Sequence, residues 1–180
     1  MKSPAAQPWI NSHVIRFAEI KPLTASPADI LLTRYRRERF SVIGRANERE
    51  PGAPGSAVGA NVNFGYIRCA SGTGNCSHKH PNWEIFIPMS GHWKLTLEGG
   101  VFDDGRHVLE LGPWDVIVIP GDTFHEAQNI SDSEACLMSL NPGIKAAGYT
   151  VHPGVIEEIR RFSAQAADAA QQAVDISVDT

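Results

Sequence analysis

Long apolar runs and an excess of positive charge are both missing from this sequence. No stretch approaches the length that a membrane-spanning helix needs. The Lys and Arg residues number 16 against 20 Asp and Glu, so the formal net charge at pH 7 is -4. Such a chain lacks the basic surface that nucleic acid or an anionic membrane attracts, and we expect neither as a partner. The first eight residues hold two prolines and no apolar run, which predicts a loose arm and no signal peptide.

Cysteine is scarce as well. Cys69, Cys76 and Cys136 are an odd number of residues without C-x-x-C spacing. This pattern favours reduced thiols and a cytoplasmic location. What the chain does contain is an ordinary globular composition, with 42% hydrophobic and 20% charged residues among 180. A chain of this length is expected to form one domain with its own core.

Short strand-like segments separated by turn residues fill the central part of the chain. In the clearest one, Trp93, Leu95 and Leu97 alternate with polar residues, which predicts a strand with one buried face. The other predicted strands cover residues 62–70, 83–88, 108–111, 116–119, 124–127 and 135–140, and the predicted turns include 98–100 and 103–105. This spacing indicates an all-β sandwich or barrel with its core over residues 61–141.

Residues 1–45 are predicted to form an N-terminal arm and outer strands. Residues 9–20 suggest short strands, and residues 30–43 suggest a long strand or hairpin arm. The second segment carries four arginines, Arg34, Arg36, Arg37 and Arg39. We expect them on a solvated strand face; the alternative is a site for an anionic substrate, if some of these side chains faced a cavity.

Two segments outside the predicted barrel are candidates for contacts with a second subunit. Residues 46–60 form a Gly- and Pro-rich loop, which is a lid, a subunit-contact arm or a simple surface crossing. Residues 142–180 are predicted to be a linker and an amphipathic helix, because apolar residues recur at three- and four-residue steps from Val155 onward. Glu157 and Glu158 suit the first turn of a helix. We expect this helix to pack on the barrel or a second subunit, and the chain to form a homodimer.

Two histidines and a glutamate have the spacing of metal ligands. His78 and His80 are one residue apart, so on a strand both side chains would point to the same face. Residues 81–83, Pro-Asn-Trp, predict a turn that brings Glu84 back beside them. Imidazole nitrogens and a carboxylate oxygen suit a borderline divalent metal. The alternative is a solvated hairpin without a metal.

A longer pattern around these residues resembles a known family. Gly72, His78, His80, Glu84 and Gly91 follow the spacing G-x5-H-x-H-x3-E-x6-G, which resembles the first motif of the cupin superfamily. Further along the chain, the second motif of that family, G-x5-P-x-G-x2-H-x3-N, is matched by Pro120, His125 and Asn129, with Trp114 and Asp122 standing where the family has glycine. The resemblance covers roughly residues 60–140, and the two non-glycine residues make the loop geometry there an open question.

The resemblance implies both a fold and a metal site. The implied fold is a double-stranded β-helix, or jelly-roll barrel, followed by the C-terminal helix. The implied metal ligands are His78, His80, Glu84 and His125. Three imidazoles and one carboxylate leave positions open on an octahedral ion, which argues against a closed structural zinc site. We expect one divalent ion per chain, Fe(II) first, with Mn(II), Ni(II) and Zn(II) as alternatives.

The function that this resemblance favours is an Fe(II) dioxygenase that cleaves or oxidises a small aromatic or keto/enol substrate. In that reading Glu84 is also a candidate base. One alternative is an oxygen-independent isomerase, lyase or decarboxylase that uses the ion as a Lewis acid. Another is a non-catalytic cupin that binds a metal or a small ligand; the lack of a DNA-binding segment weakens a sensor role.

Other chemically capable residues are assigned simpler roles. The remaining histidines are expected at the surface or behind the ligands: His13, His92, His107 and His152. Cys76 is either a loop thiol or a cavity residue, since it precedes His78 by two positions. The aromatic residues near the ligands line a substrate pocket or fill the barrel core: Trp83, Trp93, Trp114, Phe86 and Phe124.

Overall fold

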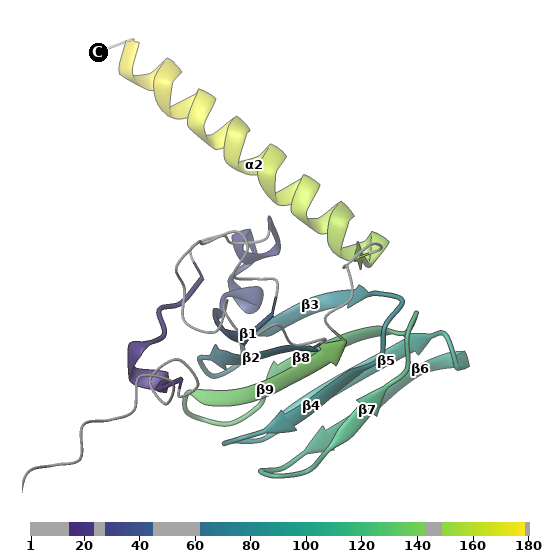
Figure 1. Ribbon diagram of the computed structural model, residues 1–180. Helices are drawn as coiled ribbons and strands as arrows, with labels where there is room; N and C mark the ends of the chain where they lie inside the picture. Colours follow the sequence, from purple (N-terminus) through teal and green to yellow (C-terminus); the bar gives the residue numbers. More distant parts are fainter. Residues whose placement is uncertain (1–14, 24–27, 45–61, 143–148, 179–180) are drawn as a thin grey trace, which may run out of the picture.

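Two antiparallel five-stranded sheets face each other in the computed structural model (Figure 1), which describes residues 15–23, 28–44, 62–142 and 149–178. One sheet has the strand order β1-β2-β9-β4-β7 and the other β10-β3-β8-β5-β6. The strands are β1 Glu38–Ile43, β2 Val62–Cys69, β3 Gly74–Lys79, β4 Glu84–Pro88, β5 Trp93–Gly99, β6 Phe102–Leu111, β7 Ile117–Ile119, β8 Phe124–Asn129, β9 Ala135–Pro142 and β10 Thr150–Val151. The predicted jelly-roll barrel is confirmed.

The core lies between the two sheets. Trp93, Leu95 and Leu97 on β5 are buried in the core, and Lys94 and Thr96 between them point to the outer side, where Thr96 is also buried. Phe86 from β4 and Leu137 from β9 meet them from the opposite sheet. β5 thus turns alternate residues inward, as the period of two predicted.

The predicted long strand over residues 30–43 is wrong in its first half. Residues Ala28–Leu31 (η2) and Thr33–Tyr35 (η3) are 3-10 helices, and only Glu38–Ile43 is a strand. Leu32 and Tyr35 pack into one cluster with Cys76. Two residues three positions apart share a face of a 3-10 helix, whereas a strand would point them to opposite faces.

The arginines of this segment do not share a solvated face. The Arg37 side chain is 4% exposed and donates to Asp29 Oδ2 and to the Tyr35 carbonyl, each at 2.7 Å. Its predicted exposure was therefore wrong. Arg34 is largely exposed and pairs with Glu158 on the C-terminal helix.

Two smaller predictions also need correction. Residues 103–105 lie inside β6, because the turn after β5 is made by Gly99 and Gly100, both at positive φ (71° and 61°). In the N-terminal arm, the described part holds a 3-10 helix, Phe17–Glu19 (η1), instead of a strand. Residues 1–14 and the predicted loop at 46–60 lie outside the described residues.

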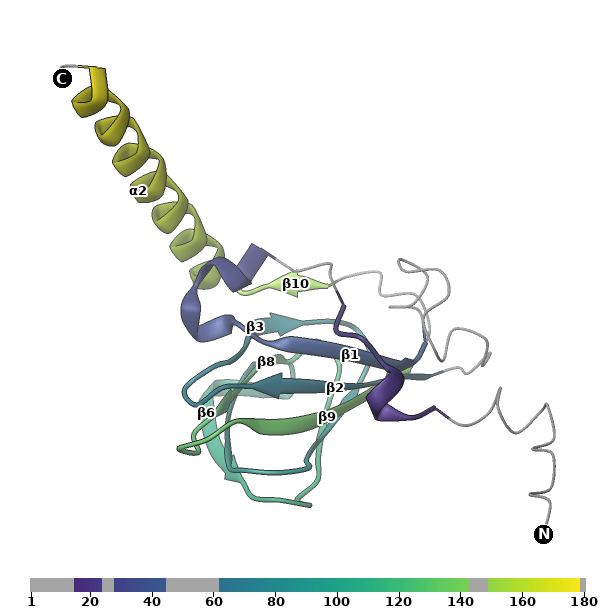
Figure 2. The same cartoon turned by 90° about the vertical axis from the view of Figure 1, so that its left-hand side faces the viewer.

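The C-terminal helix α2, Pro153–Val178, contacts the rest of the chain through its beginning (Figure 2). Val155 is buried with Leu32 and Tyr35, and Ile159 packs partly against the same cluster. Phe162, one turn further on, is 44% exposed. The later turns project away from the barrel in both views. No helix among the described residues is long and apolar enough to span a membrane.

Candidate metal centre

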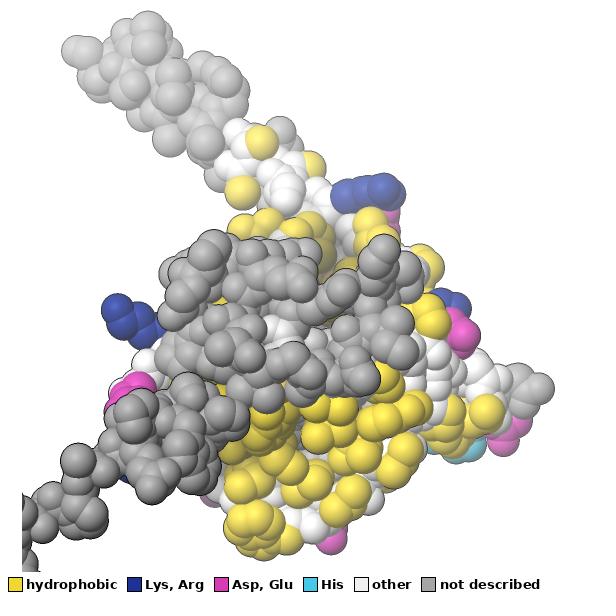
Figure 3. All heavy atoms as spheres, in the orientation of Figure 1, with side chains coloured by type: hydrophobic (Ala, Val, Ile, Leu, Met, Phe, Trp, Pro, Cys, Tyr) yellow, Lys and Arg dark blue, Asp and Glu magenta, His cyan; other side chains and the backbone are white. Residues whose placement is uncertain are grey.

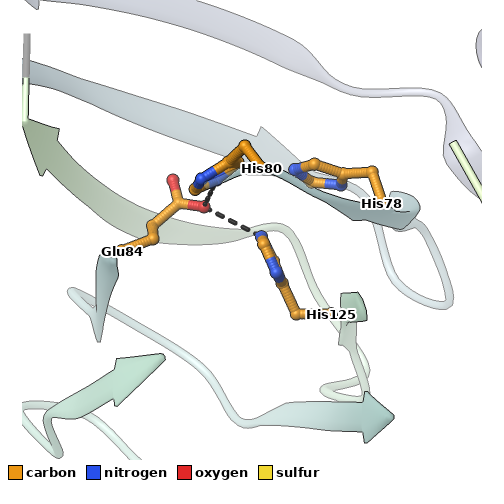
Figure 4. Close-up of side chains that lie close together, drawn as sticks. All are labelled: His78, His80, Glu84 and His125. Carbon is orange, nitrogen blue, oxygen red and sulfur yellow. Dashed lines mark hydrogen bonds and ion pairs between the residues drawn. The ribbon is translucent and has the colours of Figure 1, made fainter. Parts of the chain in front are cut away.

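The fold brings His78, His80, Glu84 and His125 together at one place inside the barrel (Figure 4). One potential ligand atom from each residue lies within 4.8 Å of all the others. The side chains of Glu84 and His125 are 6% and 2% exposed, and that of His80 is 12% exposed. Of the described residues, these four form the only such group.

Strand pairing explains how distant residues meet here. His78 on β3 lies directly opposite His125 on β8, and their ring centres are 4.4 Å apart. The chain then bends at residues 81–82, as predicted, and Glu84 begins β4 in the facing sheet. Directly opposed side chains of an antiparallel pair are near neighbours, so the two histidines meet by register alone.

A tight loop contact holds the turn that carries His80. The backbone N–H of Asp122 donates to the His80 carbonyl at 2.8 Å. A Cβ on Gly121 would lie 2.0 Å from the Pro81 carbonyl oxygen, so only glycine fits there. Asp122 and Trp114 both keep positive φ, 61° and 72°, at the positions where the cupin motif has glycine. The loop geometry is thus retained despite both substitutions.

Each imidazole is oriented by a backbone carbonyl. Nδ1 lies 2.8 Å from Cys76 O in His78, 2.8 Å from Asn82 O in His80 and 2.9 Å from Thr123 O in His125. A carbonyl oxygen only accepts, so each Nδ1 carries the proton and donates it. The unprotonated Nε2 of each ring is then left to bind a metal, with its orientation fixed from behind.

The Glu84 carboxylate lies where these nitrogens converge. Its Oε2 is 3.1 Å from His80 Nε2 and 2.9 Å from His125 Nε2. With both rings protonated at Nδ1, lone pairs of nitrogen and oxygen would face one another in a buried space. Such an arrangement needs a cation between them. The donor set therefore fits a divalent metal ion.

The protonation states agree with a ligand role. Burial lowers the pKa of His78 to about 3, and the neighbouring His125 ring acts in the same direction. Burial alone would raise the pKa of Glu84, but the adjoining His125 and His80 rings hold that pKa well below its usual range. Burial alone would likewise lower the pKa of His80, but the adjoining Glu84 carboxylate raises it. A neutral His78 and an ionised Glu84 at neutral pH are the forms that bind metals.

Sequence reasoning missed three residues that contact the ligands. Ser139 Oγ donates to Glu84 Oε1 at 2.5 Å, and Asn141 Nδ2 donates to the same oxygen at 3.3 Å. The Tyr149 ring stacks on the His78 ring at 4.7 Å. The sequence did hold a signal for Ser139 and Asn141, because they are polar residues at the inward-facing positions of a largely apolar strand. Tyr149 had none.

The other candidates lie away from the ligands. His107 binds Asp104 at the surface, His92 is exposed, and His152 lies beside the Phe124 ring on the outside of the barrel; His13 is not described. A bulge between Asn75 and His78 interrupts the alternation of β3. The Cys76 thiol consequently packs with Leu32 and Val155, and burial raises its pKa to about 12.

The aromatic residues do not gather into one pocket at the ligands. Phe86 is the exception, with its ring 5.8 Å from the His125 ring. Trp93 belongs to the barrel core, and Trp83 and Trp114 are exposed. The core interpretation therefore holds for Phe86 and Trp93.

Comparison with known proteins defines the class of fold. No protein-family model matches the sequence, and no curated protein matches it. Solved cupin structures match the fold, which confirms the resemblance drawn from the two motifs: the chain has the cupin fold.

Three such structures illustrate the match. An oxalate decarboxylase from Lactobacillus farciminis is 17% identical over 76% of this chain, with a TM-score of 0.54. This chain spans only 35% of that enzyme's length. A recombinant oxalate oxidase is 18% identical over 79% of this chain and 67% of its own, with a TM-score of 0.54. A cupin 2 domain-containing protein from Halorhodospira halophila is 14% identical over 73% of this chain and 81% of its own, with a TM-score of 0.52. Identities this low establish a common fold and leave the reaction to the site itself.

Proposed function

We propose that this protein is a metal-dependent enzyme that binds one divalent ion through His78, His80, Glu84 and His125 and acts on a small molecule. The observation that carries the proposal is the convergence of imidazole nitrogens on Glu84, with every Nδ1 tied to a backbone carbonyl. A merely structural cluster of buried histidines would not need all three rings in the same tautomer.

The four ligand residues would leave part of the coordination sphere of a bound ion free. Three imidazoles and a carboxylate supply four donors, so an octahedral ion would keep two positions for exchangeable ligands. When bound, the ion supplies Lewis-acid chemistry and a template for substrate. Of the His80, Glu84 and His125 side chains, that of His80 is the most exposed, so we expect substrate to approach the ion beside His80. Ser139 and Asn141 fix Glu84 Oε1 and leave Oε2 for the ion.

The reaction class that we expect first is Fe(II)-dependent dioxygenation of an aromatic or keto/enol substrate. Three imidazoles and a carboxylate would hold an Fe(II) ion and leave room on it for an oxygen-chelating substrate. Glu84 is proposed as a ligand and as a candidate base, although its lowered pKa makes it a weak one.

The second candidate is an oxygen-independent reaction, such as a decarboxylation, with Mn(II) as the ion. The observation that favours it is the similarity of fold to oxalate decarboxylases, of which the Bacillus subtilis enzyme has Mn(II) centres. A short carboxylate substrate would use the same exchangeable positions.

Anaerobic purification followed by metal analysis separates these proposals. The protein loaded with Fe(II) or Mn(II) is offered diketones, phenols and oxalate, and oxygen uptake and carbon dioxide release are followed. Oxygen consumption with Fe(II) supports the dioxygenase, and turnover that persists without oxygen supports the decarboxylase. The His125→Ala variant should bind no metal, whereas His107→Ala, at a surface histidine, should behave as wild type. A wild-type chain that binds neither ion would contradict the proposal.

A further inference from the structure

The outer face of the β1-β2-β9-β4-β7 sheet is apolar across four adjacent strands. Phe64, Leu140, Ile85 and Val118 are cross-strand neighbours and form one row. Tyr66, Met138 and Ile87 form the next row, which Val116 continues just before β7. Figure 3 shows hydrophobic side chains gathered over the region where Figure 1 places β4, β7 and β9. We call these two rows the apolar sheet face.

The sequences of these strands are those of a sheet buried on both sides. β4 reads Glu-Ile-Phe-Ile-Pro, and the segment 116–119 reads Val-Ile-Val-Ile, with no polar residue on the outward positions. Strands covered on both faces have such continuous apolar runs, whereas strands with one wet face alternate. The opposite sheet alternates: Lys94, Thr96, Glu126 and Gln128 are paired on its outer side. The difference indicates that the first sheet is covered over β4 and β7, whereas β5 and β8 of the opposite sheet have a polar outer side.

The chain itself covers only part of the apolar sheet face. Phe17 packs on Phe40 and Tyr66, with ring centres 5.0 Å and 5.5 Å apart, over the β1–β2 side. On the β4–β7 side, Val116 and Val118 are 59% and 60% exposed. Among residues 15–23, 28–44, 62–142 and 149–178, none shields these two valines from solvent.

Trp114 adds an independent observation at the edge of this face. It lies two residues before Val116, and its backbone N–H donates to the Pro88 carbonyl at the end of β4. Its side chain is 68% exposed, and its φ of 72° is a conformation that costs a non-glycine residue free energy. An exposed tryptophan in a strained conformation contributes little to the folding stability of the isolated chain. Tryptophan is, however, among the residues most enriched at the centres of protein interfaces.

We infer that a second copy of this chain packs on the apolar sheet face through a two-fold axis, sheet against sheet. A face without charge is complementary to itself, as an interface with two-fold symmetry requires. Two rows of outward residues across four strands cover about 260 Å² in projection, and a stable interface buries about 800 Å² per partner. The face is thus large enough to be the centre of such an interface. Its uniformly apolar character matches permanent homodimers, because interfaces with transient partners are more polar.

The mass in solution tests this inference directly. We expect light scattering on wild-type protein at micromolar concentration to give twice the chain mass of 19.6 kDa. The Val116→Lys/Val118→Lys variant should be a monomer with unchanged circular dichroism and metal content, because both side chains are exposed in the single chain. Val108→Lys is the matched control: Val108 is 59% exposed on β6 of the other sheet, and this variant should remain a dimer. A wild-type monomer, or a dimer that survives the double substitution, would overturn the inference.

Trp114→Gly provides a second test that does not introduce charge. Glycine accepts the positive φ without cost, so the melting temperature of the monomeric double-lysine background should not fall when this change is added. In the wild-type background, the same change should weaken dimerisation by about 30-fold, as measured by sedimentation over a dilution series. Unchanged dimerisation would show that Trp114 is outside the interface and that the contact is not centred on this face.

Discussion

At the scale of single residues, the candidate metal centre depends on short-range backbone geometry. In each of the three histidines, the carbonyl that accepts from Nδ1 belongs to a residue two positions away in the chain: Cys76 for His78, Asn82 for His80 and Thr123 for His125. The tautomer of each ring is therefore set by a neighbouring residue of the same segment. Only Glu84 depends on a distant element, because Ser139 and Asn141 of β9 hold its outer oxygen.

The first prediction concerns these two polar residues. Ser139→Ala and Asn141→Ala should each lower metal affinity by about 10- to 100-fold, because residues that orient a ligand have effects of this size. Chelator competition measures the affinity. Ser41→Ala changes another buried serine, on β1, and should leave the affinity unchanged. Equal affinity in all three variants would show that Glu84 needs no support from β9.

The second prediction concerns acid stability of the metal-free protein. The folded-state pKa of His78 is lowered to about 3 from an ordinary value near 6.5, so the unfolded chain binds the additional proton between these values. His78 consequently destabilises the fold progressively as pH falls from about 6.5 towards 3. The raised pKa of His80 acts in the opposite direction, which makes a comparison with a variant necessary.

Chemical denaturation of wild-type and His78→Gln protein at pH 7 and pH 4 isolates the contribution of His78. We expect wild type to lose up to about 3 kcal/mol more than the variant over this range. An equal loss in both proteins would mean that His78 is protonated in the folded state at pH 4.

At the scale of elements, the segment over residues 28–37 covers the outside of β3 and ties it to α2. Asp29 and Arg37 form an ion pair whose side chains are 2% and 4% exposed. Leu32 and Tyr35 pack with Cys76 and with Val155 at the beginning of α2. Because Cys76 is two residues from His78, this covering also supports the strand that carries the metal ligands.

The third prediction follows from the burial of that ion pair. Asp29→Ala leaves the Arg37 charge buried without its carboxylate, and should cost about 3–5 kcal/mol of unfolding free energy. Arg34→Ala, which breaks an exposed pair with Glu158, should cost less than about 1 kcal/mol. Urea denaturation measures both. Similar losses for the two variants would show that the Asp29–Arg37 pair is not buried in solution.

The fourth prediction concerns α2. Among its side chains that the structure describes, Val155 and Ile159 pack in a hydrophobic cluster with the rest of the chain, so a chain that ends at Ser163 should melt within about 2 °C of the full chain. The same truncated chain should still form the dimer proposed through the apolar sheet face. Val155→Ala, in contrast, should cost about 1–2 kcal/mol, since it removes buried methyl groups. Loss of the dimer on truncation would assign the subunit contact to α2.

At the scale of the whole molecule, the two sheets have different outer surfaces. The sheet that carries His78 and His125 has a polar outer side over β5 and β8, and the sheet that carries Glu84 has an apolar outer side. A dimer formed through the second of these sheets would place each Glu84 strand near the two-fold axis.

The sequence by itself determined the barrel and the candidate ligands. Turn residues at regular spacing and alternation along residues 93–97 depend on local geometry, and the two cupin-like motifs are fixed spacings around such turns. The resemblance to cupins that these motifs carry implied His78, His80, Glu84 and His125 as ligands before the fold was known, and the fold brings all four together. Predicting the cupin fold and the four metal ligands required no information on long-range packing.

Only the tertiary structure decided the rest, because those features depend on what packs against a residue from elsewhere in the chain. The 3-10 helices over residues 28–35 and the burial of Arg37 arise from contacts with β3 and α2. The side on which Cys76 points follows from a bulge, which no spacing predicts. Trp114 was an unexplained departure in the sequence. The structure shows a strained, exposed tryptophan at the edge of the apolar sheet face.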